Sequence, residues 1–465
     1  MLVTEQIPRL SDLPESGSRV HLLGAAGAGM RALAAVLIDG GWKVTGSDRD
    51  TEALRSLSAI GLTPVSESDS SAGTNAALVI RSSAVPGDHP TVTAAYQAGV
   101  PILKRAVAVG ALVNERRLAA VAGTHGKTTV TTMLGLALEA ADRDPLVLVG
   151  GHVSEWGGNA RIGRGPEAVV EADEYDRSFL QLDPTLAVVT SVEPEHLECY
   201  DSEAGMRSAF QTFAASAVDR AGVLVCADDA GALELGTAIG NRLSYGFSAS
   251  ADYRVEIVAA TSDGQHCRVK GRDLDLSFDL AAPGAHNAQN AAAALVSALR
   301  LGAEVESLTG CLRHFRGVDR RLQVVGSRGD VVIVDDYAHH PTEVRASISA
   351  VRSAWPGARL IVVFQPHLYS RTRAMAAEFG RELSSADQAL VLPIYPAREE
   401  PIEGVDAGLV VQDAPGHVRQ GSVDEAVGLA AEAGGETVVV FMGAGDVTEA
   451  AHRAAGELTG DALGV

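Results

Sequence analysis

The sequence predicts an α/β protein made of three successive blocks, each organised around a parallel β-sheet. Apolar or β-branched runs of strand length alternate with helical stretches along most of the 465 residues. This alternation is typical of doubly wound parallel sheets. A glycine-rich turn follows the opening strand of each of the first two blocks. Because a chain of this length normally forms about two to four domains, we place the blocks at residues 1–116, 117–322 and 323–465.

The first block is predicted to be a Rossmann-like domain. A strand at 19–23 leads into Gly24-Ala25-Ala26-Gly27-Ala28-Gly29, a helix begins at Met30, and a second strand ends in Asp48. This is the order of a dinucleotide-binding turn followed by the acid that binds a ribose. Ala26 stands where that fingerprint has its central glycine, which argues against NAD. Binding of a nucleotide or diphosphate, and a tight turn without a ligand, both stay open.

Three further elements complete the first block. Strands are expected at 76–81 and 100–103, with a helix at 91–98 between them. The polar stretch 114–117 suits a linker to the second block.

The second block opens on Gly123-Thr124-His125-Gly126-Lys127-Thr128-Thr129, between an apolar strand and a helical stretch. Backbone N–H groups of such a turn, with the helix N-terminus behind them, bind phosphate. Lys127 can reach the outer phosphates, and the Thr128 hydroxyl is placed to bind Mg²⁺. Only two residues separate the glycines, so this is a shortened phosphate loop. The chain has only four lysines, which argues against a surface role for Lys127. The loop predicts ATP use; a glycine-rich loop without a ligand is the alternative.

The rest of the second block is predicted to complete a central ATPase-type α/β domain. Strands are expected at 146–149, 168–171, 186–190 and 222–226, and the strand-rich stretch 242–280 predicts an additional small β-sheet. His286-Asn287-Ala288-Gln289-Asn290 then opens an alanine-rich helix. Alanine favours the helix, and its small side chain allows close packing on a sheet.

Two acidic groups follow neighbouring strands of the second block. They are Glu171-Ala172-Asp173-Glu174-Tyr175-Asp176 and Glu193-Pro194-Glu195-His196. Ligands of α/β sheets bind at the carboxyl ends of the strands, and carboxylate oxygens suit Mg²⁺, with Mn²⁺ as a substitute. A neutral imidazole can complete such a metal shell. A solvated acidic loop and a structural histidine are the alternatives.

The third block is predicted to be a second Rossmann-like domain with a parallel sheet. Its short strands are expected at 331–334, 360–364, 389–394 and 437–441. Asp335-Asp336-Tyr337-Ala338-His339-His340-Pro341 follows the first of them, and the stretch from Phe364 to Arg373 ends the second. Two polar clusters at neighbouring strand ends favour a binding site over surface residues. Arg320-Arg321 stand at the junction with the second block, where an arginine can reach an ATP phosphate when domains close.

The bulk composition excludes several classes of partner. A formal net charge of −21 argues against non-specific binding to nucleic acid or to an anionic membrane. The four cysteines show no spacing for zinc or for a disulfide framework. The N-terminus lacks the pattern of a signal peptide, and no apolar run reaches the roughly 20 residues of a membrane helix. A soluble, cytoplasmic protein is expected.

These residues together resemble the ATP-dependent Mur ligases of peptidoglycan synthesis, over essentially the whole chain. The resemblance rests on the phosphate loop, the two acidic groups, His286 to Ala291, Phe315 to Arg321, Asp335 to Glu343 and Phe364 to Arg373. The last two stretches and the N-terminal turn point to the member that joins L-alanine to UDP-N-acetylmuramate. A recycling ligase that adds a preformed peptide to the same sugar nucleotide is the alternative within the family.

The resemblance implies three domains that bind, in order, the UDP-sugar, ATP and the amino acid. Implied UDP-sugar contacts are Gly24, Ala25, Ala26, Gly27, Gly29, Met30, Asp48, Ser82 and Ser83. Implied ATP contacts are Gly123, Thr124, His125, Gly126, Lys127, Thr128, Thr129, His286, Asn287, Asn290, Arg320 and Asp336. Implied metal ligands are Thr128, Glu171 and His196. Implied amino-acid contacts are Tyr337, His339, His340, His367, Tyr369, Arg371 and Arg373. Implied catalytic residues are Lys127, Glu171, His196, Arg320, His339, His340 and His367.

The implied chemistry needs no nucleophilic side chain. ATP converts the lactyl carboxylate to an acyl phosphate, which the amine then attacks, and Mg²⁺, a lysine and N–H groups stabilise the negative charge on oxygen. The implied substrates are UDP-N-acetylmuramate, L-alanine and ATP, for a monomer or a homodimer. A folylpolyglutamate synthetase, a nucleotide-dependent regulator or transport ATPase, and an oxidoreductase fit the motifs less well.

Several residues depart from the family pattern. Ala25 and Ala26 replace glycines, Arg31 replaces serine, and Ser191 replaces asparagine. No lysine occurs between Lys127 and Lys270, so we predict a metal site without the carbamylated lysine of several sister ligases.

Overall fold

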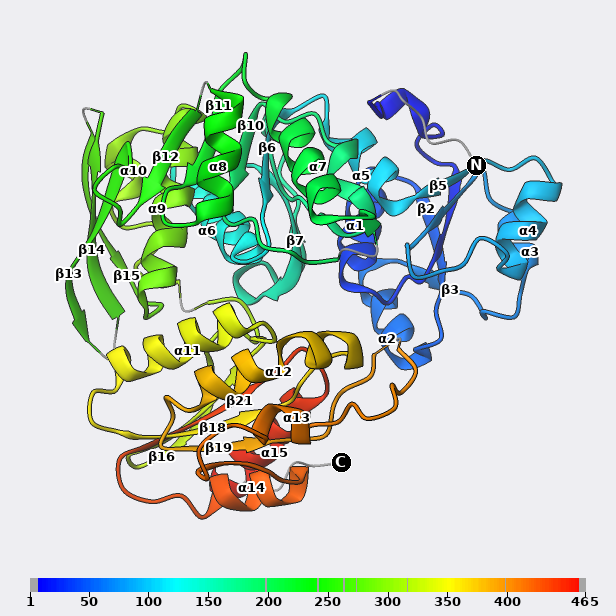
Figure 1. Cartoon of the computed structure of the whole chain (residues 1–465). Coiled ribbons are helices and arrows are strands. Elements are labelled where there is room, and N and C mark those ends of the chain that lie inside the picture. The colour runs from blue at the N-terminus through cyan, green and yellow to red at the C-terminus, as the bar shows by residue number, and fades with distance from the viewer. Residues whose placement is uncertain are drawn as a thin grey trace. The chain divides into compact units, whose positions relative to one another are not determined.

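The computed structural model describes residues 7–196, 199–240, 242–261, 264–272, 274–315, 317–397 and 399–459 (Figure 1). The chain folds into two compact units. The first unit comprises the residues up to 256 together with 268–278 and 289–312, and the second comprises 257–267, 279–288 and the chain from 313 onward. The first unit holds the N-terminal sheet and most of a central sheet, and the second holds the C-terminal sheet.

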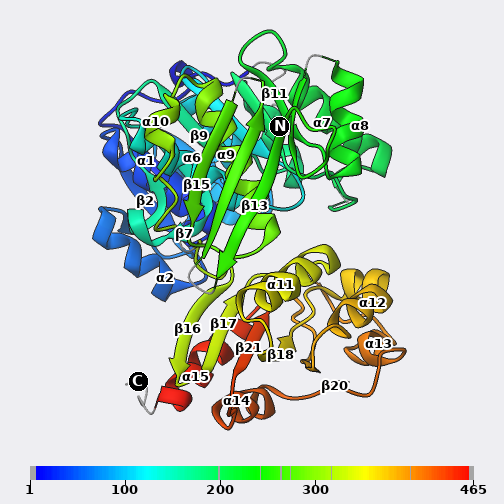
Figure 2. The same ribbon diagram turned by 90° about the vertical axis from the view of Figure 1, so that its left-hand side faces the viewer.

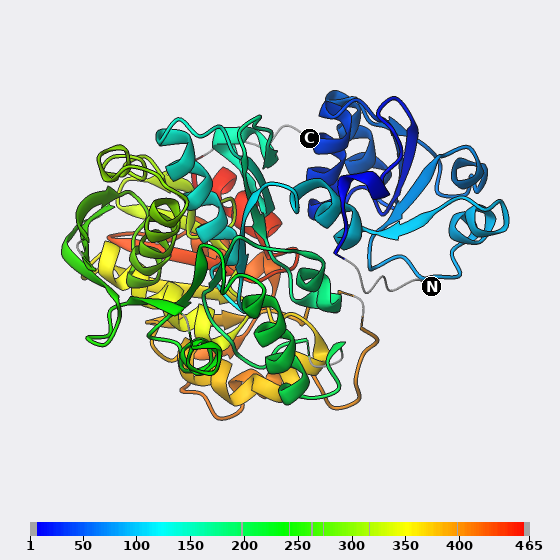
Figure 3. The same cartoon turned by 90° about the horizontal axis from the view of Figure 1, so that it is seen from above.

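The N-terminal sheet of the first unit is Rossmann-like, as predicted. Its strands are β1 (Arg19–Leu23), β2 (Lys43–Ser47), β3 (Thr63–Pro64), β4 (Leu78–Arg81) and β5 (Ile102–Lys104). They pair in parallel in the order β3-β2-β1-β4-β5. The helices drawn in blue around this sheet in Figure 3 are α1 (Ala28–Asp39), α2 (Thr51–Ser56), α3 (Ser71–Thr74), α4 (Pro90–Gln97) and α5 (Arg105–Val113). The strand order reverses between β1 and β4, which is where open α/β sheets bind ligands.

The central sheet has ten strands in the order β15-β14-β13-β12-β11-β10-β6-β9-β7-β8. The strands are β6 (Arg117–Ala122), β7 (Leu146–Val153), β8 (Gly158–Arg161), β9 (Glu167–Glu171), β10 (Leu186–Val189), β11 (Gly222–Cys226), β12 (Arg242–Gly246), β13 (Tyr253–Thr261), β14 (Gly264–Gly271) and β15 (Leu274–Leu280). The helices of this region are α6 (Lys127–Ala140), α7 (Glu203–Ala215), α8 (Ala230–Ile239), α9 (Ala285–Arg300) and α10 (Val305–Leu308).

The strands expected as an additional small sheet are joined to the central one. β13, β14 and β15 are the long neighbouring strands of Figure 2. They continue the central sheet through a short parallel pair that matches Tyr245 with Tyr253 and Gly246 with Arg254. The predicted alanine-rich helix forms as α9, and its residues Ala288, Ala291, Ala292, Ala293 and Ala294 are 0% exposed.

The second unit is a sheet covered by helices on both faces (Figure 1). Its strands are β16 (Gln323–Arg328), β17 (Val331–Asp336), β18 (Arg359–Phe364), β19 (Gln388–Val391), β20 (Val418–Gln420) and β21 (Thr437–Met442), in the order β16-β17-β21-β18-β19-β20. Alternate strand residues face opposite cores: Val362 packs with α11 (Pro341–Ala354), α12 (Tyr369–Leu383) and α13 (Gly408–Val411), and Val363 packs with α14 (Val423–Ala431) and α15 (Val447–Thr459).

The four strands predicted for this sheet pair in parallel, as expected, but the sheet also has an edge strand that was not predicted, β16. β16 pairs antiparallel with β17, because a hairpin turn reverses the chain at Gly329, which has φ 59°. Among the described residues, no helix combines the length and the apolar character that crossing a membrane requires.

Candidate active site

The phosphate loop lies between β6 and α6, and the backbone requires both of its glycines. Gly123 has φ 138° and Gly126 has φ 81°, which are strained values for other residues. A Cβ atom at Gly123 would lie 2.1 Å from the Thr190 hydroxyl oxygen, and one at Gly126 would lie 2.8 Å from the amide oxygen of Asn290. The structure therefore brings Asn290 of α9 against the loop.

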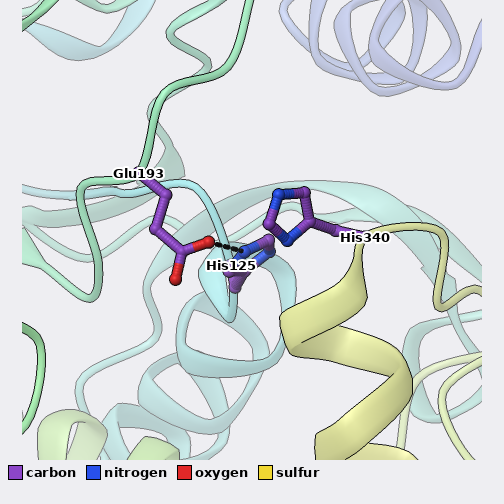
Figure 4. A group of neighbouring side chains, drawn as sticks. All are labelled: His125, Glu193 and His340. Carbon is purple, nitrogen blue, oxygen red and sulfur yellow. Dashed lines mark hydrogen bonds and ion pairs between the residues drawn. The ribbon is translucent and has the colours of Figure 1, made fainter. Parts of the chain in front are cut away.

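The segment after β10 holds the loop in place. Thr124 N–H donates to the Ser191 carbonyl at 3.1 Å, and His125 N–H donates to the Ser191 hydroxyl at 2.9 Å. Glu193 N–H donates to the Thr124 hydroxyl at 2.9 Å. The His125 imidazole lies 3.2 Å from the Glu193 carboxylate (Figure 4). Ser191 thus shapes the phosphate loop directly, through its carbonyl and its hydroxyl.

The Lys127 side chain is folded back onto the loop. Its ammonium donates to the Gly123 carbonyl, to the Thr124 carbonyl at 3.2 Å and to Glu174 at 2.9 Å. Burial by itself lowers the pKa of Lys127, but the attraction of nearby carboxylates, Glu174 first, outweighs burial and raises that pKa above its ordinary value. The amine therefore stays protonated and holds a positive charge inside the loop.

Thr128 and Glu171 lie side by side. The Thr128 hydroxyl donates to Oε1 of Glu171 at 2.9 Å, and the Gly150 N–H donates to Oε2 at 2.6 Å. The two contacts fix the orientation of the carboxylate. Adjacent hydroxyl and carboxylate oxygens are the hard donors that Mg²⁺ binds, so these two residues fit the ion that the sequence predicts.

His196 belongs to a different group of side chains. One ligand atom each from Glu174, Glu195 and His196 lies within 4.8 Å of the others. The three predicted metal ligands therefore fall into two groups: Thr128 with Glu171, and His196 with two acids that the sequence analysis did not select as ligands. Both acids stand in the quoted motifs, but sequence order does not show which carboxylates turn toward the imidazole.

A cavity of about 360 Å³ in the first unit brings the N-terminal turn together with the acids after β9. Its lining includes Gly27, Gly29, Met30, Ser82 and Ser83, all predicted to contact the UDP-sugar. It also includes Glu171, Asp173 and Arg105. The cavity thus combines backbone N–H groups at a helix start, hydroxyls and a cation, which suit a diphosphate.

Other predicted UDP-sugar residues are not among those that line this cavity. Ala25 is 0% exposed and packs against Gly46, where a Cβ atom would lie 2.8 Å from the Ala25 methyl. The Asp48 carboxylate accepts the Ala26 N–H at 2.9 Å, and Arg31 Nε donates to the Ala26 carbonyl at 2.6 Å. Asp48 and Arg31 therefore hold the N–H and the carbonyl of the same turn residue, Ala26.

Sequence reasoning missed two cations beside the cavity. Arg105 lies 3.2 Å from Asp173, and its guanidinium is so close to Gly29 that a Cβ there would meet it at 2.7 Å. Lys104 lies 2.7 Å from Asp176. Both residues could have been selected from the sequence, because they stand at the carboxyl end of the predicted strand β5. Ligands of open α/β sheets bind at that edge.

Asp336 anchors the turn before β16 in the second unit. Leu322 N–H donates to its Oδ2 at 3.0 Å and Ala338 N–H to its Oδ1 at 2.7 Å, and the Ser347 hydroxyl lies 3.2 Å from Oδ2. Burial raises the pKa of Asp336 to about 6, against the opposing attraction of Arg321. These contacts give Asp336 a structural task in this turn.

Arg320 is bound within its own unit. It has φ 62°, and its guanidinium donates to the carbonyls of Gly443 at 2.7 Å and Gly445 at 3.0 Å. It also lies 4.8 Å from the centre of the Tyr337 ring. An ATP contact from Arg320 stays a prediction.

Four aromatic rings form a row at the carboxyl edge of the second unit's sheet. The centres of Tyr337 and His339 are 5.2 Å apart, those of His339 and His367 are 5.9 Å apart, and those of His367 and Tyr395 are 5.7 Å apart. His367 and Tyr395 also form an isolated parallel bridge. Tyr395 was missed because it follows a different strand, and only the sheet order places it on His367.

The other predicted residues of the second unit are more scattered. His340 is buried and caps α11, accepting the Thr342 N–H at 3.4 Å. Tyr369 begins α12, where Arg371 is half-buried and Arg373 is exposed.

At the start of α9, Asn287 donates to the Pro283 carbonyl at 2.8 Å. Burial, and then the nearby Arg321 charge, lowers the pKa of His286 to about 4.

A phosphate-loop motif beside a paired hydroxyl and carboxylate, with a cluster of polar rings on a separate sheet, is typical of nucleotide-dependent α/β enzymes of several domains. Three family models match the chain: the Mur ligase family catalytic domain over residues 19–117, the Mur ligase middle domain over 121–298, and the Mur ligase glutamate ligase domain over 320–445. The chain belongs to the Mur ligase family.

Its relatives match over nearly their full length. The UDP-N-acetylmuramate–L-alanine ligase of Paenarthrobacter aurescens is 41% identical, with 93% of this chain and 96% of that protein covered. The ligase of the same name from Streptomyces coelicolor is 39% identical, with 96% and 99% covered. The crystal structure of UDP-N-acetylmuramate–alanine ligase from Thermotoga maritima matches with a TM-score of 0.79 and 27% identity, over 96% of this chain and 100% of that one.

Proposed function

We propose that this protein is an ATP-dependent ligase that joins L-alanine to UDP-N-acetylmuramate, giving UDP-N-acetylmuramoyl-L-alanine, ADP and phosphate. The observation that carries the proposal is the identity of 39–41% over nearly the whole chain with relatives that bear this name. We propose that the lysine-bearing phosphate loop binds ATP and that the cavity beside the N-terminal turn binds the sugar nucleotide.

The reaction has two steps. A lactyl carboxylate oxygen attacks the γ-phosphorus of ATP, ADP leaves, and an acyl phosphate forms. The amine of alanine then attacks the acyl carbon, and the tetrahedral intermediate loses phosphate while the amine loses its proton. Both steps build negative charge on oxygen, so preorganised cations and N–H groups lower both barriers.

Residues of the first unit account for the phosphoryl half of this scheme. Lys127 and the loop N–H groups are proposed to bind the outer phosphates. Thr128 and Glu171 would hold Mg²⁺, which when bound neutralises charge on the transferring phosphoryl group. Arg105 and Ser83, which line the cavity, are proposed to bind the UDP-sugar.

Residues of the second unit are proposed to bind the amino acid. The half-buried His339 and His367 belong to the ring row, and Arg371 follows on the first turn of α12. An arginine suits the carboxylate of alanine, because its donors match that planar group.

We further propose that the three predicted domains, 1–116, 117–322 and 323–465, bind the UDP-sugar, ATP and alanine in that order. The division is supported by the three family-model matches over residues 19–117, 121–298 and 320–445, because each match falls almost wholly within one predicted domain. The enzyme would act in the cytoplasm on small-molecule substrates, as a monomer or a homodimer.

The recycling ligase, the alternative that the sequence left open, is not favoured. A murein peptide ligase from Psychrobacter arcticus matches with a TM-score of 0.69 but 23% identity, over 97% of this chain and 100% of that one. That similarity speaks for the fold alone.

Incubation with ATP, Mg²⁺ and UDP-N-acetylmuramate, and with L-alanine, glycine, L-serine or a tripeptide in separate reactions, tests the proposal. Phosphate release and the mass of the product are measured. We expect phosphate release and a product heavier by one alanyl residue with L-alanine. Turnover with the tripeptide alone, or none with any amine, would refute the proposal.

A further inference from the structure

The ammonium of Lys127 has no donor left for a phosphate. A protonated lysine carries three N–H donors. They are directed at the Gly123 carbonyl, at the Thr124 carbonyl at 3.2 Å, and at the Glu174 carboxylate, both of whose oxygens lie 2.9 Å from the nitrogen. Any phosphate that binds Lys127 must therefore displace at least one of these acceptors.

Glu174 is the acceptor that competes with a phosphate most directly. It is the only ionisable group among the three acceptors, and its side chain is only 3% exposed. Its main chain is held as well, because the hydroxyl of Tyr200, itself 1% exposed, donates to the Glu174 carbonyl. The carboxylate is thus kept beside the lysine by burial and by its own backbone.

We propose that Glu174 is a positioning residue that neutralises Lys127 while the phosphate loop is empty and releases the ammonium to the phosphates of ATP. This inference rests on the proposed role of Lys127 in ATP binding. A buried charge without a partner is costly, so the empty loop needs an anion in the place that a phosphate later takes. Glu174 and the nucleotide therefore bind the same cation in turn.

The proposal makes two linked expectations for Glu174→Gln, which keeps the size of the side chain and removes its charge. Without nucleotide, the variant melts at a lower temperature than the unaltered protein, because Lys127 has lost its counter-charge. With ATP, the variant binds about tenfold more tightly, because no ion pair has to be broken. The same loss of the ion pair thus lowers the stability of the nucleotide-free variant and raises its affinity for ATP.

Binding of ATP is measured by calorimetry in excess EDTA without the sugar nucleotide, so that neither turnover nor a metal contributes. Lys127→Met is expected to weaken ATP binding, and the double variant is expected to bind ATP as Lys127→Met does. Such a double-mutant cycle isolates the Glu174–Lys127 interaction. Glu304→Gln, which changes an exposed acid on the loop before α10, is the matched control and is expected to bind ATP like the unaltered protein.

The outcomes separate this inference from the proposed function. If Lys127→Met binds ATP normally, the phosphate role of Lys127 fails, and this inference fails with it. If Lys127→Met binds ATP weakly but Glu174→Gln does not bind it more tightly, only the role of Glu174 is refuted. If Glu174→Gln does not fold, Glu174→Asp carries the test, because its shorter side chain lengthens the ion pair; unchanged or weaker ATP binding by that variant overturns the inference.

Discussion

The ammonium of Lys104 and the hydroxyl of Ser83 meet at one oxygen of Asp176, each at 2.7 Å. These contacts join the N-terminal sheet of the first unit to the loop that follows β9. The same loop carries Glu174, which holds Lys127 of the phosphate loop. A single short segment therefore contacts both the surroundings of the proposed sugar-nucleotide site and the phosphate loop.

Asp176→Asn tests the sugar-nucleotide end of this segment. Asp176 has φ 55°, a conformation that asparagine tolerates, so the loop should keep its shape while the ion pair is lost. We expect the KM for UDP-N-acetylmuramate to rise about three- to tenfold with an unchanged KM for ATP. The partly exposed pair contributes under about 1 kcal/mol to stability. Asp201→Asn is the control, because Asp201 also has a positive φ of 61° and its side chain is 98% exposed.

Glu171→Gln tests the proposed cation site. The amide keeps one oxygen near Thr128 but loses the charge that binds a divalent cation. We expect kcat to fall about 10²- to 10³-fold, and the Mg²⁺ concentration needed for half-maximal rate to rise. Initial rates over a Mg²⁺ titration measure both. Normal turnover at low Mg²⁺ would show that the cation is held elsewhere.

Tyr395→Ala tests the row of rings. Stacking on His367 at 5.7 Å with an interplanar angle of 15° is worth about 0.5–1.5 kcal/mol. Without it, the KM for L-alanine should rise about two- to tenfold with little change in the KM for ATP. Tyr395→Phe keeps the ring and should behave like the unaltered enzyme. An equal loss in both variants would point to the hydroxyl instead.

His21 makes the free energy of unfolding depend on pH. The ring is fully buried and lies 2.9 Å from the Thr45 hydroxyl. Burial lowers the pKa of His21 from 6.5 to about 4. The unfolded chain thus binds more protons between these values, and the free energy of unfolding falls as the pH drops from about 6.5 to 4, by on the order of 2–3 kcal/mol. Urea unfolding at several pH values measures this dependence. For His21→Gln, the free energy of unfolding should change less steeply with pH between about 4 and 6.5.

Asp336 makes the free energy of unfolding change with pH in the opposite direction to His21. Its folded pKa of about 6 exceeds the ordinary 3.8, so the folded state binds more protons between these values. The free energy of unfolding therefore falls as the pH rises from about 4 to 6, and Asp336→Asn should remove this component. The variant also turns an amide N–H toward Leu322 N–H or Ala338 N–H, costing about 1–3 kcal/mol. Unfolding followed by fluorescence over this pH range tests both effects.

The elements with strong local patterns could be predicted from the sequence. β1 and β11 match their expected bounds, Arg19–Leu23 and Gly222–Cys226, because apolar runs of strand length are bounded by polar or glycine residues. The Gly123 and Gly126 turn was predictable since glycine is required there and a helix follows. The antiparallel pairing of β16 with β17 could not be predicted. One hairpin at Gly329 sets the direction of β16, and the hydrophobic pattern of the strand would be the same in either direction.

The residue types of the candidate site could be predicted from the sequence, but the contacts between its side chains could not. The motif that contains Glu171 and Glu174 was evident in the sequence. Only the folded backbone shows that Glu171 contacts Thr128 and that Glu174 contacts Lys127. Asp176 turns toward Lys104 through a left-handed conformation that nothing in its neighbours demands. Long-range contacts of this kind depend on sheet order, which local patterns do not encode.

The chain passes between its two compact units five times, after residues 256, 267, 278, 288 and 312. Four of these passages run inside β13, β14, β15 and α9 rather than through loops. No single peptide bond can therefore be cut, genetically or by a protease, to release two self-contained halves. An expression fragment that starts at residue 313 would lack segments 257–267 and 279–288, and the complementary fragment would carry them without the rest of their unit.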